Sequence, residues 1–212
     1  MTVVITGTSR GIGAGLAQSY RARGDEVIGT TRGGDWPLDV TDPDSQKALS
    51  AKLQGRPIDL LVCNAGVYLD KGERLDSGYD SQLWADTFAA NVTGVFLTVQ
   101  ALLPNLEAAK HGKIAIISSQ MASSERAPGG SYIYRASKAA VLNLGRNLAA
   151  DLRARRIAVG IYHPGWVITD MGGGAADITV DDAVSGLVER FDDLSMASTG
   201  TFETWEGRAH PY

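Results

Sequence analysis

The stretch TGTSRGIG, residues 6–13, decides the fold, because it joins a short apolar run to an amphipathic segment through three glycines. The apolar run of residues 3–5 precedes it, and apolar residues recur at helical spacing from Ile12 to Tyr20. A strand, a tight turn and a helix in this order point free backbone N–H groups and the positive end of the helix at the turn. The sequence therefore predicts an anion site in this turn, suited to a pyrophosphate.

Each glycine of the turn has its own predicted role. Gly7 allows the tight turn, Gly11 lets the backbone approach the anion, and Gly13 lets the helix pack closely on the sheet. The spacing Gly-x-x-x-Gly-x-Gly differs from the common dinucleotide fingerprint Gly-x-Gly-x-x-Gly. The turn alone therefore does not separate a ligand site from a purely structural bend.

Composition limits the classes of protein to consider. A chain of 212 residues with 44% hydrophobic content is expected to form one domain, residues 1–212. The net charge of -4 and the scattered basic residues disfavour a nucleic-acid or membrane partner. The one cysteine, Cys63, fits a buried strand in a reducing compartment. With no evident membrane span or signal sequence, we expect a cytoplasmic protein.

Short apolar runs alternate with longer amphipathic ones, which predicts an α/β fold with a doubly wound parallel sheet covered on both faces. Residues 66–80 are expected to form a loop. Strands are expected at 2–6, 26–30, 36–39, 58–63, 113–118, 157–162 and 200–203, and helices at 12–23, 42–54, 80–108, 131–154 and 179–191.

A second group of residues points to proton chemistry. Tyr134 and Lys138 lie four apart on one helix face, so the ammonium is expected beside the phenol, where it would lower the phenol pKa from ~10. Such a pair can act as a general acid. Ser119, the tripeptide 64–66 and the dipeptide 164–165 each follow a predicted strand. In an open α/β sheet these positions meet at the carboxyl ends of the strands, where ligands bind.

Taken together, these motifs resemble the short-chain dehydrogenase/reductase family, in the expected order and over essentially the whole chain. They are Thr6-Gly7-x-x-x-Gly11-x-Gly13, Asn64-Ala65-Gly66, Asn91, Ser119, Tyr134-x-x-x-Lys138 and Pro164-Gly165-x-Val167-x-Thr169. The stretches YRASKAAVLN, residues 134–143, and HPGWVITDMGG, residues 163–173, resemble its small carbonyl-reductase, C-factor-like branch. The resemblance implies a Rossmann-type domain that holds both cofactor and substrate.

The resemblance also implies four catalytic residues for hydride transfer between a nicotinamide and a carbonyl. Tyr134 would donate the proton, and Lys138 would bind the nicotinamide ribose and lower the pKa of the phenol. Ser119 would hold the carbonyl oxygen, and Asn91 would hold a water that links Lys138 to solvent. Because the interval from 119 to 134 is longer than is common in the family, Ser118 and Ser123 remain alternatives to Ser119.

The expected cofactor is NADP(H). Arg32 follows the second predicted strand with no acid at the strand end, and Arg10 can approach a 2'-phosphate from the glycine turn. Asp35 lies beyond two glycines and is expected in a solvated loop. The residues expected to bind the cofactor are Gly7, Ser9, Arg10, Gly11, Ile12, Gly13, Arg32, Asp39, Val40, Asn64, Ala65, Gly66, Tyr134, Lys138, Pro164, Gly165, Val167 and Thr169.

A small carbonyl compound is the expected substrate, with Trp166, Met121 and Tyr68 beside it. The short glycine-rich segment 172–179 predicts a wide pocket open to solvent, unless residues 202–212 close it.

Three widely separated histidines offer no metal site. Apolar residues on the helix of 131–154, together with the resemblance, predict a homo-oligomer, either a dimer or a tetramer.

Three functions compete. The leading one is an NADPH-dependent ketone or aldehyde reductase. A second keeps the same site but reduces C=C or C=N bonds, or runs oxidatively. A third is a nucleotide-binding signalling or sensor protein of the C-factor type with incidental turnover. The intact Ser-Tyr-Lys set argues against the third, since a sensor needs no proton donor at the nicotinamide.

Overall fold

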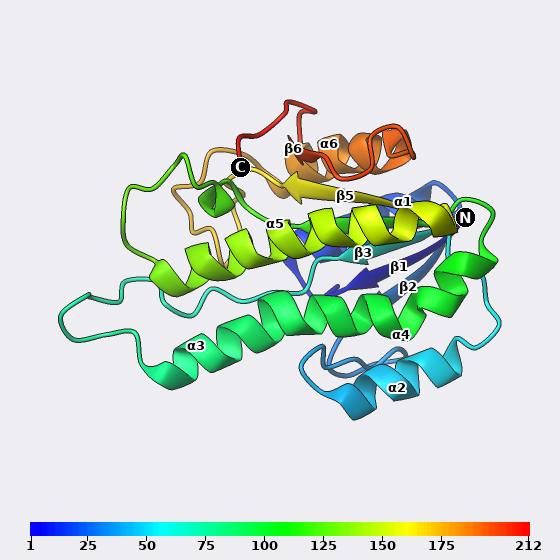
Figure 1. Cartoon of the computed structure of the whole chain (residues 1–212), viewed down its shortest axis with the longest axis horizontal. Helices are drawn as coiled ribbons and strands as arrows, with labels where there is room; N and C mark the ends of the chain where they lie inside the picture. The colour runs from blue at the N-terminus through cyan, green and yellow to red at the C-terminus, as the bar shows by residue number, and fades with distance from the viewer.

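A parallel sheet of six strands forms the middle layer of the protein in the computed structural model, which describes residues 1–212 (Figure 1). The strand order is β2-β1-β3-β4-β5-β6. The expected doubly wound parallel α/β fold is thus confirmed. The strands are β1 (Thr2–Thr6), β2 (Glu26–Thr30), β3 (Leu60–Cys63), β4 (Lys113–Ile117), β5 (Ala158–His163) and β6 (Phe202–Thr204).

The strand order reverses at β1, and this reversal places the site. From β1 the chain passes to β2 on one side, and then crosses to β3 on the other side of β1. Helices leaving neighbouring strands in opposite directions open a crevice at the carboxyl ends of those strands. Gly7 follows β1 and Asn64 follows β3, so both lie at this crevice.

Helices cover both faces of the sheet because successive strand residues point to opposite sides. Val3 and Ile5 pack against α1 (Gly11–Ala22) and α6 (Val180–Asp193). Val4 points the other way, into the core beneath α2 (Pro43–Lys52), α4 (Gly94–Ala108) and α5 (Tyr132–Leu152). Figure 1 shows α4 and α5 side by side over the near face of the sheet.

The helix predicted at 80–108 is continuous but contains an irregularity. It consists of α3 (Ser81–Phe88), a π-helical turn (Ala89–Thr93) and α4. By length and composition alone, this helix, Ser81–Ala108, could cross a membrane, with a mean hydropathy of 1.3 over an 18-residue window of which 44% is buried. Its apolar residues Leu102 and Leu106 are instead fully buried in the core beneath it.

One predicted strand is wrong. Residues 36–39 form no strand, and only Thr31 and Pro37 make an isolated bridge, because proline has no N–H to continue a ladder. The other elements agree with the predicted bounds to within two residues. Residues 66–80 contain no helix or strand, as predicted. Two short 3-10 turns, Gln120–Ala122 and Arg153–Arg155, were not predicted.

Candidate active site

In the turn after β1, Gly7 occupies a position that only glycine can take. Gly7 has a φ of +74°, and a Cβ there would lie 3.0 Å from the Cα of Ala65. A Cβ on Gly13 would lie 2.2 Å from the carbonyl oxygen of Gly7. The predicted reason for Gly7 therefore holds, while Gly13 lets the helix pack closely against the turn and Asn64 rather than against the sheet itself. The first residue before α1, Arg10, makes no side-chain cap, so the first-turn N–H groups of α1 are left for a ligand.

Asn64 holds the ends of β1 and β3 together at this turn. Its side-chain amide donates to the carbonyl oxygens of Thr6 and Gly7, both at 3.0 Å. The hydroxyl of Thr6 in turn accepts the backbone N–H groups of Asn64 and Ala65, both at 3.0 Å. These four bonds make the turn rigid, so its backbone is organised before any ligand arrives.

A cleft of about 710 Å³ opens at the carboxyl ends of the strands, above this turn. Two residues predicted to bind the cofactor do not line it: Gly165 faces a neighbouring cavity of about 450 Å³, and Val167 is buried. The predicted residues that do line it are Gly7, Ser9, Arg10, Gly11, Ile12, Gly13, Arg32, Asp39, Val40, Asn64, Ala65, Gly66, Tyr134, Lys138, Pro164 and Thr169. Sequence reasoning missed Ile168, Asp170 and Met171, which line it beside Thr169.

Tyr134 and Lys138 lie together in the first turns of α5, and both are more than nine-tenths buried. The Nζ atom of Lys138 lies 5.6 Å from the centre of the Tyr134 ring and donates to the carbonyl of Ile117 at 3.0 Å. Burial lowers the pKa of Lys138 to about 8.

The pKa of Tyr134 is raised, opposite in direction to our expectation. Burial is the main cause, since it disfavours the charged phenolate, and the hydroxyl of Ser119 works against it. The negative charge of Asp70 raises the pKa of Tyr134 further, and the neighbouring Tyr68 acts in the same direction. The phenol is therefore neutral at ordinary pH, which is the state that donates a proton.

The three candidate serines have different surroundings. Ser118 is buried and donates to the carbonyl of Lys138 at 3.0 Å. Ser123 donates to the carbonyl of Tyr212 at 3.2 Å. Ser119 accepts the N–H of Met121 at 3.1 Å, and its hydroxyl also interacts with the phenol of Tyr134. The interaction with the phenol favours Ser119 as the partner of Tyr134, whereas only Ser118 of the three serines lines the main cleft.

The comparison with known families agrees with this arrangement, since the model of the family described as short chain dehydrogenase matches residues 35–178. The chain belongs to the short-chain dehydrogenase/reductase family. C-signal of Myxococcus xanthus is 34% identical over 167 residues, which cover 78% of this chain and 99% of that protein.

Solved structures of carbonyl reductases from this oxidoreductase family have the same fold. The NADPH-bound carbonyl reductase from chicken fatty liver superposes with a TM-score of 0.91 at 31% identity, covering 100% of this chain and 98% of that one. Carbonyl reductase Sniffer of D. melanogaster superposes with a TM-score of 0.93 at 26% identity, covering 100% and 99% of the two chains.

In this short-chain dehydrogenase, Asn91 lies in the π-helical turn and is buried. Its side-chain oxygen accepts the N–H of Val67 at 2.8 Å. Its amide donates to the carbonyl of Val67 at 2.9 Å and to the hydroxyl of Ser137 at 3.0 Å. The Asn91 side chain thus already bonds the loop after β3 and α5. A water bound at this position would therefore have to hydrogen-bond a backbone group. That role stays a prediction.

The three residues expected beside the substrate lie outside the lining of the main cleft. The ring of Tyr68 stacks on that of Tyr134, with the ring centres 4.3 Å apart. Trp166 is 44% exposed and lines the neighbouring cavity, and Met121 is half-buried in the short turn after β4. Tyr68 therefore contacts the predicted acid itself, and the substrate roles of all three stay predictions.

The glycine-rich segment 172–179 is held by backbone bonds to the residues just before it. The N–H of Ile168 donates to the carbonyl of Ile178 at 2.9 Å, and the N–H of Asp177 donates to that of Trp166 at 3.0 Å. The segment thus folds back on residues 166–168, which offsets part of the entropy cost of ordering glycine.

Proposed function

We propose that this short-chain dehydrogenase reduces ketones or aldehydes with NADPH. The observation that carries the proposal is the buried, neutral phenol of Tyr134, which reaches the main cleft with the hydroxyl of Ser119 beside it and Lys138 one turn along the helix. A proton donor with a hydroxyl beside it suits a carbonyl oxygen that gains negative charge.

The residues of the cleft fit a nicotinamide dinucleotide. The turn at Gly7 and the uncapped start of α1 offer backbone N–H groups to a pyrophosphate. Arg32 lines the cleft just after β2, whereas Asp35 does not. Because no acidic residue directly follows β2, the guanidinium of Arg32 favours a 2'-phosphate there, hence NADPH over NADH. The chicken liver carbonyl reductase, which has the same fold, holds NADPH.

Asp39 and Val40 lie at the same end of the cleft as Arg32, where we place the adenine. The hydroxyl and the backbone N–H of Thr41 both donate to the carboxylate of Asp39 and lower its pKa, and the charge of Arg32 lowers it further. Asp39 is thus an anion at this end of the cleft, held by Thr41.

When bound, the nicotinamide supplies the hydride for the carbonyl carbon. The chain supplies the rest of the chemistry. Tyr134 Oη donates its proton to the carbonyl oxygen, and Ser119 Oγ donates a hydrogen bond to the same oxygen. Lys138 holds the ribose hydroxyls with its ammonium group, which is protonated below its pKa of about 8.

The proposal is tested by following NADPH oxidation across a panel of aldehydes and ketones, with an enone and an imine included. We expect turnover with carbonyl compounds, and a fall in kcat of ~10² or more in Tyr134→Phe, because a positioned acid contributes about that much. Tyr132→Phe is the matched control, since Tyr132 lies on the same helix but is 39% exposed. NADPH binding without oxidation by any substrate would support the sensor function instead.

A further inference from the structure

A carboxylate from the loop after β3 caps the helix that carries Tyr134. Asp70 is fully buried. Its carboxylate accepts the N–H of Ile133 at 2.9 Å and that of Tyr134 at 3.2 Å. These are first-turn N–H groups of α5, which have no partner inside the helix. The cap therefore bonds the backbone of the proposed proton donor directly.

This cap is not local in sequence, unlike those of other helices. Asp42 caps α2 and Asp80 caps α3, each as the residue just before its helix. The corresponding residue of α5, Ser131, has a φ of +48° and makes no cap with its side chain. Its hydroxyl bonds that of Tyr68 instead. The start of α5 is thus organised by residues 68–70, from a different loop.

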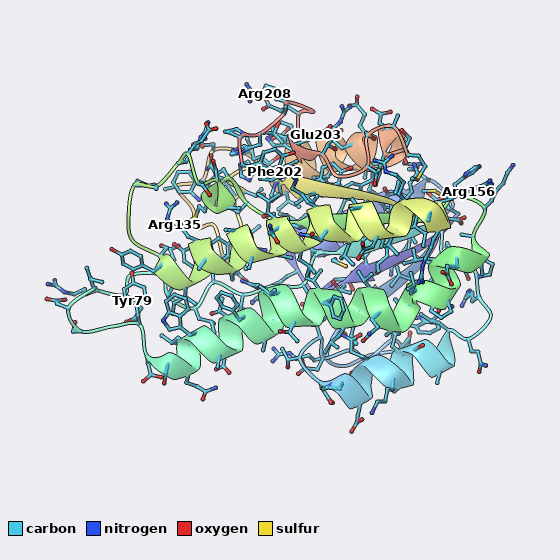
Figure 2. All side chains as sticks on the ribbon, in the orientation of Figure 1. Tyr79, Arg135, Arg156, Phe202, Glu203 and Arg208 are labelled. Carbon is cyan, nitrogen blue, oxygen red and sulfur yellow. The ribbon has the colours of Figure 1, made fainter.

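The loop of residues 66–80 surrounds this end of α5. Figure 2 shows Tyr79 of the loop beside the first turns of α5, where Arg135 is labelled. The ring of Tyr79 meets that of Tyr132 edge-on, with the centres 5.1 Å apart, while Tyr68 stacks on Tyr134. The loop therefore contacts both the backbone and the ring of Tyr134.

The charges around the phenol differ in sign. Asp70 brings a negative charge to the helix end, where the helix dipole stabilises it. Lys138 brings a positive charge from the same helix, and Ser119 and Tyr68 contribute hydroxyls. A negative charge beside a phenol opposes its ionisation, so Asp70 acts in the same direction as burial.

We propose that Asp70 is a positioning residue for Tyr134: its carboxylate fixes the first turn of α5, and with it the direction of the phenol, and places a negative charge beside the proton donor. This inference rests on the proposed function, because it assigns Tyr134 the role of acid. It assigns a task to a loop residue that no motif singles out.

The experiment compares Asp70→Asn and Asp70→Ala with the control Asp80→Asn. Asparagine keeps an oxygen that can cap but removes the charge, and alanine removes both. In Asp70→Asn we expect the alkaline limb of the kcat profile to move to lower pH, because losing a negative charge lowers the pKa of Tyr134. In Asp70→Ala we expect kcat to fall roughly tenfold or more, because the phenol of Tyr134 is no longer held in position. NADPH affinity should stay within about twofold.

Hydrogen exchange at the amides of Ile133 and Tyr134 can be measured without turnover. It therefore distinguishes failure of the inference on Asp70 from failure of the proposed function. Faster exchange in Asp70→Ala, but not in Asp80→Asn, supports the cap whatever the activity. If the unaltered protein then reduces no carbonyl compound, the proposed function fails alone. The inference on Asp70 is overturned by unchanged exchange, or by an Asp70→Asn profile that matches that of the unaltered protein.

Discussion

The hydroxyl of Ser118 donates to the backbone carbonyl of Lys138 at 3.0 Å, while Lys138 Nζ donates to the backbone carbonyl of Ile117, also at 3.0 Å. These two bonds run in opposite directions between the end of β4 and the second turn of α5. They hold the ammonium at the cleft and engage Ser118 in doing so. The hydroxyl of the next residue, Ser119, interacts with the phenol of Tyr134 and also accepts the N–H of Met121.

This relationship predicts different outcomes for two neighbouring alanine substitutions. Ser119→Ala should lower kcat by ~10², because it removes a donor to the developing charge, with a smaller loss of stability from removing the acceptor of the Met121 N–H. Ser118→Ala should instead lower the free energy of unfolding by about 1–2 kcal/mol, since it removes a donor and leaves a buried carbonyl short of a partner. Steady-state kinetics and urea unfolding measure the two effects. A larger loss of kcat in Ser118→Ala would reverse our assignment.

Cofactor choice is predicted to depend on Arg32. NADPH should bind much better than NADH, and Arg32→Asp should reverse that order, because a carboxylate repels a 2'-phosphate and accepts ribose hydroxyls. Arg10 pairs with Asp170 at 2.9 Å, but both side chains are about three-quarters exposed, so this pair should yield to the phosphate at little cost. Fluorescence titration measures both affinities, with Arg153→Asp as a control outside the cleft. Equal affinities in the unaltered protein would contradict the prediction.

The pKa of Lys138 predicts how reduction depends on pH. In the proposed mechanism the ammonium form of Lys138 holds the ribose, and this form is lost as the pH rises through about 8. We therefore expect kcat/KM for reduction to be level at lower pH and to fall above about 8. Lys138→Arg, whose charge persists, should have lower activity but no such fall. A profile that stays level to pH 10 or so in the unaltered protein would argue against a role for the ammonium.

The same lysine predicts a pH dependence of stability. The pKa of Lys138 is about 8 in the folded chain, whereas its ordinary value, which applies to the unfolded chain, is 10.5. At a pH between these two values the unfolded chain therefore binds more protons than the folded chain. The contribution of Lys138 to the free energy of unfolding should therefore rise with pH from about 8 to 10.5, and be least favourable below 8. Comparing Lys138→Met with the unaltered protein across this range isolates the contribution. If the difference in free energy of unfolding between Lys138→Met and the unaltered protein does not change with pH, this prediction is wrong.

Self-association is predicted from the outer faces of α4 and α5. Phe96 on α4 is 40% exposed, and Leu144 and Leu148 on α5 are only partly buried. We expect light scattering at micromolar concentration to give a dimer or tetramer of the 22.4 kDa chain, and Phe96→Asp to reduce the mass to that of one chain. The mass of a single chain in the unaltered protein would show that these faces need no partner.

Substrate range is predicted from the segment between the cleft and α6. Met171 and Ile168 line the cleft with more than two-fifths of each side chain exposed, and the segment 172–179 folds back on residues 166–168. We expect Michaelis constants toward the upper end of the usual ~1 μM to 1 mM range across a graded series of alkyl and aryl ketones. A preference of several orders of magnitude for one ketone would contradict an open pocket.

Most of the fold could be predicted because its signals are local. The 3.6-residue and 2-residue periodicities report which face of each helix or strand is buried, and each needs only neighbouring residues. The glycine turn and the spacing of Tyr134 and Lys138 are local in the same sense. Residues 36–39 show the limit of this reasoning, since an apolar run with a proline was too short to distinguish a strand from a loop.

The tertiary structure alone decided how the site works. The sequence placed Tyr134 beside Lys138 and predicted a lowered phenol pKa, but burial, which depends on the packing of distant elements, reversed the direction. The sequence favoured Ser119 but left Ser118 and Ser123 as alternatives. The hydroxyls of these two bond backbone carbonyls 20 and 89 residues away, which only the folded chain brings near. The cap from Asp70 spans 63 residues. Local spacing determines which groups a helix or strand can present, whereas desolvation and hydrogen-bond partners are set only when separate elements meet.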